Sequence, residues 1–153
     1  MRCHYLSPVG WFEIESDNIN ITKLGFCKIP DIIKSPETPV LQQCCRELDE
    51  YFSGKRKIFD VKIAFTGTPF QNRVWQELLK IRYGKTVSYA DLAKAAGNPK
   101  AYRAAGSANG KNPIAIIIPC HRVIASDGSL GGYAYGLKAK KQLLDLETGL
   151  NLF

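Results

Sequence analysis

The feature that most constrains this chain is an apolar run that stops at a proline and is followed by a cysteine and a histidine. Residues 112–124 read Asn-Pro-Ile-Ala-Ile-Ile-Ile-Pro-Cys-His-Arg-Val-Ile. A stretch this rich in isoleucine predicts a strand buried on both faces, which Pro119 ends because proline has no N–H to donate to a sheet. We therefore expect Cys120 at the edge of a strand.

Cys120 has neighbours that suit a nucleophile. A thiol attacks as thiolate, and an adjacent base or positive charge favours that form. His121 is a candidate base, and Arg122 adds positive charge. Most free cysteines are small buried apolar side chains. Proline, histidine and arginine are poor company in a core, so we favour a reactive thiol.

Length and composition suit one ordinary globular domain or two small ones, because the chain has 153 residues and is 45% apolar. No stretch approaches the roughly 18 apolar residues of a membrane span, and the N-terminus lacks the pattern of a secretion signal. Five cysteines without regular spacing argue against a secreted disulfide scaffold. We expect no membrane partner and a cytoplasmic location, or a nuclear one in a eukaryote.

The net charge of +7 lies entirely in the second half of the chain. Residues 1–66 hold nine basic and nine acidic side chains, whereas residues 67–153 hold twelve and five. A basic half indicates a polyanionic partner, with nucleic acid the first choice. Surface lysines that maintain solubility explain the charge alone equally well. We place a domain boundary between residues 66 and 67.

The first domain shows alternating and helical patterns. Residues 11–15 and 19–26 alternate around an Asp-Asn turn, which predicts a hairpin, and residues 58–65 predict another strand. Between them, one face of a helix that ends at Gly54 is formed by Leu41, Cys44, Leu48, Tyr51 and Phe52. Cys44 is therefore expected in the core.

Metal binding is not expected in this domain. Cys3, His4 and Cys27 are the nearest to a ligand set, but they lack the spacing of a zinc site. Whether Cys3 and Cys27 bridge is left open by the sequence.

The second domain begins with three helices. Thr68-Pro69 predicts the start of a helix that Gly84 ends. Ser88 caps a second helix that runs to Gly97, and a third runs from Lys100 to about Ala108. The last two form a helix-turn-helix shape, which alone is a weak signal because most helix pairs do not contact DNA.

The third of these helices carries little side-chain bulk. It contains four alanines and a glycine, with Arg103 as its long projection. Such a helix can approach a phosphate backbone or a groove closely. Packing against another helix would also explain the small residues, but Arg103 among them makes us favour nucleic acid.

The end of the chain combines a loop with a final helix. Residues 125–136 include four glycines and two tyrosines, which predicts an irregular loop forming one wall of a pocket. The tyrosines could stack on a planar ligand or cover the core. Residues 138–149 predict a helix, and Glu147 borders its buried face. A partly buried acid needs a partner, for which His121 is a candidate.

The pentapeptide Pro119-Cys120-His121-Arg122-Val123 follows an apolar stretch and precedes the glycine loop and the helix with Glu147. With this arrangement the chain closely resembles the O6-alkylguanine-DNA alkyltransferases, also called methylated-DNA–protein-cysteine methyltransferases. The resemblance runs from about Thr68 to Gly149, and this pentapeptide is a highly specific signal. It implies an α+β fold: a small ribonuclease-H-like α/β unit over residues 1–66, then a mostly helical domain over residues 67–153 with a winged-helix-like helix-turn-helix.

The resemblance also implies single-turnover repair. Some relatives bind zinc in the N-terminal unit, but the ligand set is not evident here, so we expect neither a cofactor nor a metal. An alkyl group on O6 of a flipped guanine, or on O4 of thymine, is transferred irreversibly to Cys120. His121 would take the thiol proton through a water, and Glu147 would orient the imidazole. Asn112 would brace the turn before the active-site segment.

Carried onto this chain, the family's DNA contacts imply a monomer that binds double-stranded DNA through the minor groove. Tyr89 would turn the nucleotide outward and hydrogen-bond guanine N3, and Arg103 would fill the gap left by the base. The DNA backbone would be contacted at Ala90, Asn98 and Ser126.

Three further positions would hold the flipped base. Val123 would offer its carbonyl to the exocyclic amine, Tyr133 would pack against the base, and the Ala134 N–H would face O6. Many relatives have a serine at the Ala134 position, so substrate range stays open.

Three other functions fit parts of the sequence. The alkyltransferase-like proteins bind alkylated DNA without transfer because their cysteine is replaced, which Cys120 argues against. A cysteine hydrolase would turn over repeatedly. A DNA-binding regulator would have no use for the reactive segment.

Overall fold

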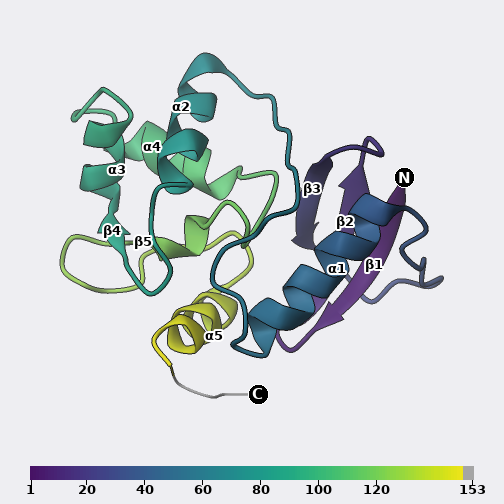
Figure 1. Cartoon of the computed structure of the whole chain (residues 1–153). Coiled ribbons are helices and arrows are strands. Elements are labelled where there is room, and N and C mark those ends of the chain that lie inside the picture. Colours follow the sequence, from purple (N-terminus) through teal and green to yellow (C-terminus); the bar gives the residue numbers. More distant parts are fainter. Residues whose placement is uncertain (150–153) are drawn as a thin grey trace.

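The computed structural model describes residues 1–149, which mix helices with two small sheets (Figure 1). In chain order the elements are β1 (Arg2–Ser7), β2 (Gly10–Ser16), β3 (Ile21–Phe26), α1 (Pro39–Phe52), α2 (Pro69–Leu78), β4 (Val87–Ser88), α3 (Tyr89–Ala95), α4 (Tyr102–Gly110), a 3₁₀ helix (Cys120–Arg122), β5 (Val123–Ile124) and α5 (Leu137–Glu147). Within residues 1–149, no helix has the length and apolar character that a bilayer crossing requires.

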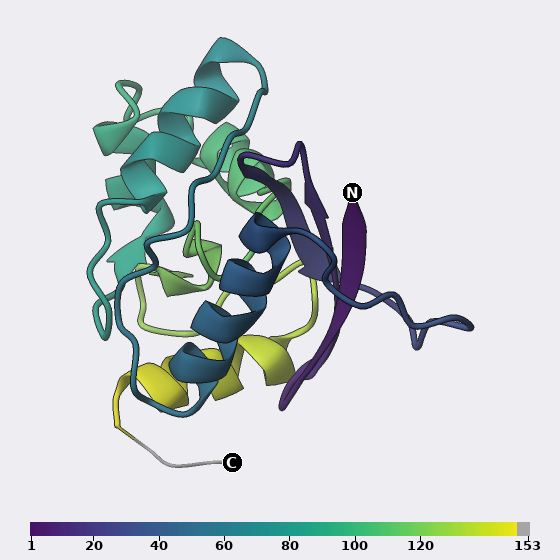
Figure 2. The same cartoon turned by 45° about the vertical axis from the view of Figure 1, so that its right-hand side comes forward.

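The N-terminal segment, residues 1–66, is an antiparallel sheet of β1, β2 and β3 with α1 packed across it (Figure 2). The predicted hairpin and helix are confirmed, and β1 is an additional strand. Thr38 caps α1 by accepting from the Leu41 N–H, and Pro39 occupies the first turn. Cys44 is fully buried, as expected.

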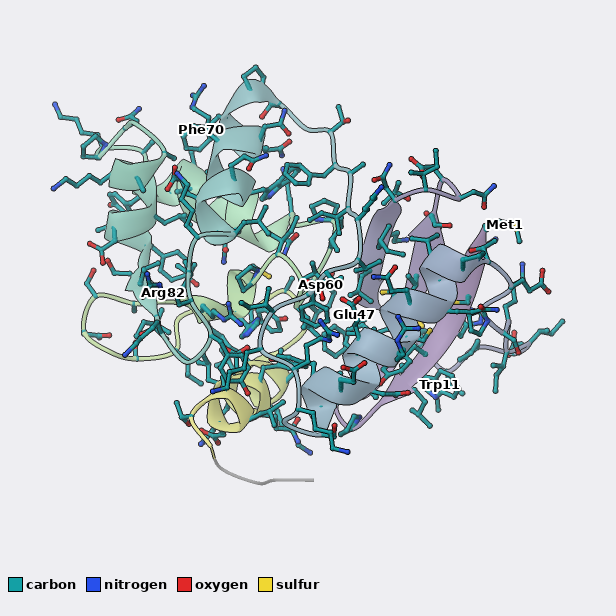
Figure 3. All side chains as sticks on the ribbon, in the orientation of Figure 1. Met1, Trp11, Glu47, Asp60, Phe70 and Arg82 are labelled. Atoms are coloured by element: carbon teal, nitrogen blue, oxygen red, sulfur yellow. The ribbon has the colours of Figure 1, made fainter. Side chains whose placement is uncertain are left out.

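The strand expected over residues 58–65 is wrong, because this segment forms only an isolated bridge between Ile63 and Ile21. The Asp60 and Val61 N–H groups donate to Oε1 of Glu47 at 2.7 and 3.0 Å. A side chain of α1 thus occupies donors that a sheet would need, and Figure 3 shows Glu47 and Asp60 next to each other. Ile58, the first residue of the expected strand, is 76% exposed.

The strand expected over residues 112–118 is also wrong, although its burial was predicted correctly. Only Ile114 makes a bridge, to Leu24, and Ile116 has a φ of +70° in the left-handed region. The Asn112 amide donates to the Ile118 carbonyl at 2.6 Å and accepts from the Ile114 N–H at 2.9 Å. These bonds fold the segment into buried turns, and Cys120 follows as the first residue of the 3₁₀ helix.

Helices α2, α3 and α4 pack on one another, as the predicted helix-turn-helix shape requires. Both α2 and α3 begin with reciprocal capping bonds, at Thr68 and Ser88. Their limits differ from the prediction, because α2 ends at Leu78 and α4 begins at Tyr102. The Trp75 indole N–H donates to the Ala108 carbonyl at 2.9 Å, which fastens α2 to α4.

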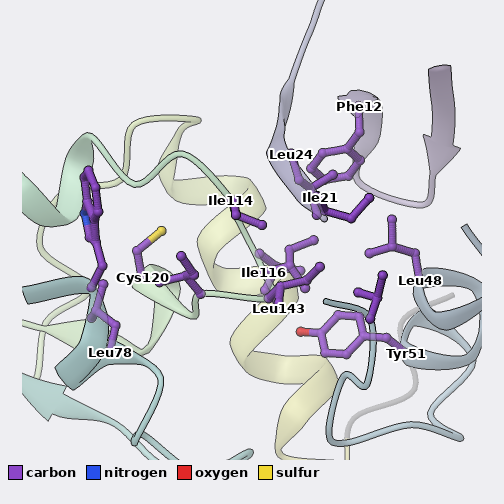
Figure 4. Close-up of a cluster of buried hydrophobic side chains, with 14 of the residues drawn as sticks. Phe12, Ile21, Leu24, Leu48, Tyr51, Leu78, Ile114, Ile116, Cys120 and Leu143 are labelled. Carbon is purple, nitrogen blue, oxygen red and sulfur yellow. The ribbon is translucent and has the colours of Figure 1, made fainter. Parts of the chain in front are cut away.

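One hydrophobic core extends through both halves of the described chain. Figure 4 shows Ile114, Ile116 and Leu143 facing Leu24 and Leu48 of the N-terminal segment. The buried turns before Cys120 therefore lie between the sheet–helix layer and α5, which fixes the position of the cysteine.

Candidate active site

Cys120 lies at the wall of a cavity of about 200 Å³. The thiol residue is only 3% exposed, and its N–H donates to the Ile118 carbonyl at 2.8 Å. The cavity lies between α3, α4 and the glycine loop, residues 125–136, and its lining includes Tyr89, Asn112, Tyr133 and Ala134. A larger groove near Met1 has no cysteine or histidine in its lining, so the Cys120 cavity is the candidate site.

The resting thiol of Cys120 is protonated at neutral pH. Burial raises its pKa, although the Asn112 amide, the Lys140 ammonium and the Tyr133 hydroxyl oppose this rise. A buried thiol of this kind needs a base that removes its proton when it reacts.

His121 is placed to be that base. Its Nε2 lies 2.7 Å from Oε2 of Glu147, the predicted partner. A carboxylate only accepts, so Nε2 carries the proton and Nδ1 keeps its lone pair. Nδ1 has no partner among residues 1–149. Burial lowers the pKa of His121, against the opposing effect of Glu147, so the imidazole is neutral and able to accept a proton.

Glu147 is held by more donors than the sequence indicated. Oε1 accepts from Arg122 Nε at 2.7 Å, and Oε2 accepts from Arg122 at 3.0 Å and from the Tyr51 hydroxyl at 2.6 Å. Burial would raise the pKa of Glu147, but His121 and Arg122 bring it to about 2. The Arg122 charge, which we expected to favour the thiolate, is thus directed at Glu147.

Lys140 is a buried residue that the sequence analysis missed. It is 0% exposed, and its ammonium donates to the carbonyls of Val123 at 2.6 Å, Gly132 at 3.0 Å and Leu130. Burial lowers its pKa to about 8. The spacing of Lys140 from Glu147 is i, i+7 on one helix face, and this periodicity could have found it.

Tyr89 lines the cavity and packs against the hydrophobic core. Its hydroxyl donates to the Gly132 carbonyl at 3.1 Å, and its ring lies 5.7 Å from the Lys140 ammonium. A Cβ on Gly131 would come within 2.8 Å of this ring, and Gly131 has a φ of +69°. The glycine loop can therefore close on Tyr89 only because this position has no side chain.

Of the other predicted pocket residues, Tyr133 and Ala134 belong to the cavity lining, whereas Val123 does not. The Tyr133 hydroxyl has no hydrogen-bond partner among the described residues. Ala134 is exposed at the edge of the cavity. The Val123 carbonyl already accepts from Lys140, which leaves one lone pair for a ligand. Asn109, which the sequence analysis did not select, lines the cavity and donates to the Cys120 carbonyl at 3.3 Å.

Four of the five residues predicted to contact DNA are exposed: Ala90, Asn98, Arg103 and Ser126. The fifth, Tyr89, is half-buried at the cavity. The exposed four come from α3, the turn after it, α4 and the glycine loop. Figure 1 shows α3 on the side of the molecule away from the three-stranded sheet. The Arg103 guanidinium lies over the Tyr102 ring at 5.9 Å.

Four of the five cysteines lie in the N-terminal segment, and all five are free thiols. Cys3 approaches Cys45, with 4.0 Å between the sulfur atoms, and does not bridge to Cys27. Residues 1–149 contain no group of three or more histidine, cysteine or acidic side chains that could hold a metal ion.

A cavity cysteine beside a histidine–glutamate pair defines a protein with a thiol nucleophile. Two family models match this chain: 6-O-methylguanine DNA methyltransferase, ribonuclease-like domain, over residues 1–65, and the DNA binding domain of the same methyltransferase over residues 69–149. The chain belongs to the 6-O-methylguanine DNA methyltransferase family.

Individual relatives agree with this assignment. The chain is 47% identical over 146 residues to the methylated-DNA–protein-cysteine methyltransferase of Methanosarcina acetivorans, covering 92% of this chain and 94% of the relative. It is 50% identical over 152 residues to the constitutive enzyme of Bacillus subtilis, covering 92% and 91%. A crystal structure of Mycobacterium tuberculosis OGT in complex with DNA has a TM-score of 0.87 at 40% identity, covering 96% of this chain and 92% of that one.

Proposed function

We propose that this protein repairs alkylated DNA by direct reversal, moving an alkyl group from O6 of guanine, or O4 of thymine, to its own Cys120. The observation that carries the proposal is the buried His121, which directly follows the cavity cysteine Cys120 in the chain. Its Nε2 is bonded to Glu147, and its Nδ1 has no partner among residues 1–149. The names of its relatives, and the likeness to a structure bound to DNA, support the same function.

The reaction is a single displacement at carbon. His121 Nδ1 takes the Cys120 proton through a solvent molecule, the sulfur forms a bond to the alkyl carbon, and the bond from that carbon to O6 breaks. The guanine regains one proton, which balances the proton lost by the thiol. The product is a thioether, which has no route back to a thiol here, so each molecule acts once.

Several residues shape the cavity for a rotated base. Asn112 holds the turns behind Cys120, as its two bonds to the 114–118 segment suggest. Tyr89 crowds the target nucleotide and bonds guanine N3. The base packs on Tyr133, with the Val123 carbonyl facing its amine and the Ala134 N–H facing O6.

The protein engages double-stranded DNA as a monomer through the minor groove. Arg103, on the α4 helix of small side chains, enters the gap left by the flipped base. Extruding the base from the duplex costs a few kcal/mol. The backbone is held at Ala90, Asn98 and Ser126, the exposed positions described above. We also propose a ribonuclease-H-like domain over residues 1–66 and a winged-helix-like domain over residues 67–153, of which 150–153 lie outside the described residues. The proposed location is the cytoplasm, or the nucleus in a eukaryote.

The test is incubation with duplex DNA that carries O6-methylguanine with a labelled methyl group. We expect one label per protein molecule, on Cys120, and no transfer by Cys120→Ala, which should still bind the DNA. Repeated turnover would instead support a hydrolase, and binding without labelling would support a protein that only recognises damaged DNA.

A further inference from the structure

The carboxylate of Glu147 is bonded from two distant parts of the chain. His121 and Arg122 belong to the 3₁₀ helix beside Cys120, whereas Tyr51 belongs to α1, 96 positions before Glu147. The Tyr51 hydroxyl donates to Oε2 at 2.6 Å, and this oxygen also binds Nε2 of His121 at 2.7 Å. Tyr51 is 0% exposed, and Figure 4 shows its hydroxyl turned away from α1, toward the helix that carries Leu143.

We propose that Tyr51 is a positioning residue for the transfer centre, which fixes the Glu147 oxygen that holds His121 and so adjusts how readily His121 accepts the Cys120 proton. The inference rests on the alkyl-transfer function proposed above. Tyr51 is not part of the cavity lining, so it acts only through Glu147. Through this one bond the N-terminal segment takes part in the chemistry of the other half of the chain.

The physical basis is that Tyr51 and His121 share one acceptor. An O–H donor draws electron density from Oε2, which weakens the attraction of this oxygen for a protonated imidazole. Removal of the hydroxyl should therefore make His121 easier to protonate, and the neutral base would be present only at higher pH.

Other charged or titratable groups also face the imidazole–carboxylate pair. They are Arg122 on the 3₁₀ helix, Lys140 on α5, Tyr83 after α2 and Tyr133 in the glycine loop. Each is unchanged by a substitution at Tyr51, so the comparison isolates the contribution of one hydroxyl.

A purely structural role for Tyr51 makes a different prediction. Its ring packs with those of Phe52, Phe59 and Tyr83, at centroid distances of 5.1, 5.6 and 6.2 Å. Tyr51→Phe keeps this packing and removes only the hydroxyl. If the bond merely fastens α1 to α5, the variant should lose stability or rate equally at every pH.

The experiment is the single-turnover rate of methyl transfer as a function of pH for the whole protein and for Tyr51→Phe. We expect the acidic midpoint of the rate profile to move up by about half a pH unit to one unit, the size expected for one hydrogen bond. NMR titration gives a second readout, because the chain has only two histidines, His4 and His121. The pKa of His121 should rise by the same amount.

A matched control is Tyr5→Phe, which removes another tyrosine–carboxylate bond, from Tyr5 to Asp49 at 2.7 Å, in the same segment. Its rate profile should keep the wild-type midpoint. Equal midpoints for wild type and Tyr51→Phe, with an unmoved His121 titration, would overturn the positioning role. No labelling of the wild-type protein would instead refute the proposed function, and the NMR titration would still test Tyr51.

If Tyr51→Phe does not fold, 3,5-difluorotyrosine at this position preserves the shape and makes the hydroxyl a stronger donor. The midpoint should then move down. An unchanged midpoint would also overturn the inference.

Discussion

Glu147→Gln should cost the protein about 3 kcal/mol of unfolding free energy at neutral pH. The substitution preserves shape but places an amide donor against the donors of His121, Arg122 and Tyr51. The pKa of Glu147 falls from an ordinary 4.5 to about 2 in the folded protein. At 1.36 kcal/mol per pKa unit this is about 3 kcal/mol, within the range for breaking a buried ion pair.

The pH dependence gives the prediction its sign. The folded pKa is below the unfolded one, so the contribution of the carboxylate is complete above pH 4.5 and is lost as the pH falls to about 2. Urea unfolding of wild type and variant at several pH values measures this difference. We expect it to be largest near pH 7 and to shrink below pH 4.5.

The exposed pair of Glu77 with Lys80 supplies the control. Glu77→Gln should change the unfolding free energy by about 1 kcal/mol or less. The reasoning about Glu147 would be refuted if its substitution had an effect as small as this, or an effect that stayed constant down to pH 2.

Three further predictions follow from the cavity and the DNA-facing surface. Arg103→Ala should slow repair in duplex DNA about tenfold or more but leave reaction with free O6-benzylguanine nearly unchanged; equal losses would contradict its role in extrusion. Lys140→Met should slow transfer by freeing the carbonyls of the glycine loop. Because burial lowers the pKa of Lys140 to about 8, wild type should gain stability between pH 8 and 10.5, where the unfolded chain still binds the proton, and the variant should lack this rise in urea unfolding. Gly131→Ala should displace Tyr89 and reduce transfer more than stability, as parallel rate and thermal-melting measurements would show.

The link between His121 and Glu147 was predictable because two local patterns agree. Helical spacing placed Glu147 at the border of a buried face, and a buried acid requires a partner. The contact of Tyr51 with the same carboxylate could not be predicted in this way, since helical periodicity marks Tyr51 as buried without showing what its hydroxyl meets.

The two strands that were predicted but do not form have a common cause. Alternating or continuous apolar residues report burial, but the backbone conformation at 58–65 and 112–118 is decided by the side chains of Glu47 and Asn112. These two polar groups take up main-chain partners that strands would have used. Neither contact has a signal in residue periodicity.

The interleaving of Leu24 and Leu48 with Ile114, Ile116 and Leu143 limits how this molecule could be shortened. A fragment beginning near residue 67 would retain the cysteine, histidine and glutamate, yet it would present several isoleucines to water and leave the Glu147 oxygen without its tyrosine. Any shortened version must first replace the apolar contacts and the tyrosine hydroxyl that the N-terminal segment supplies.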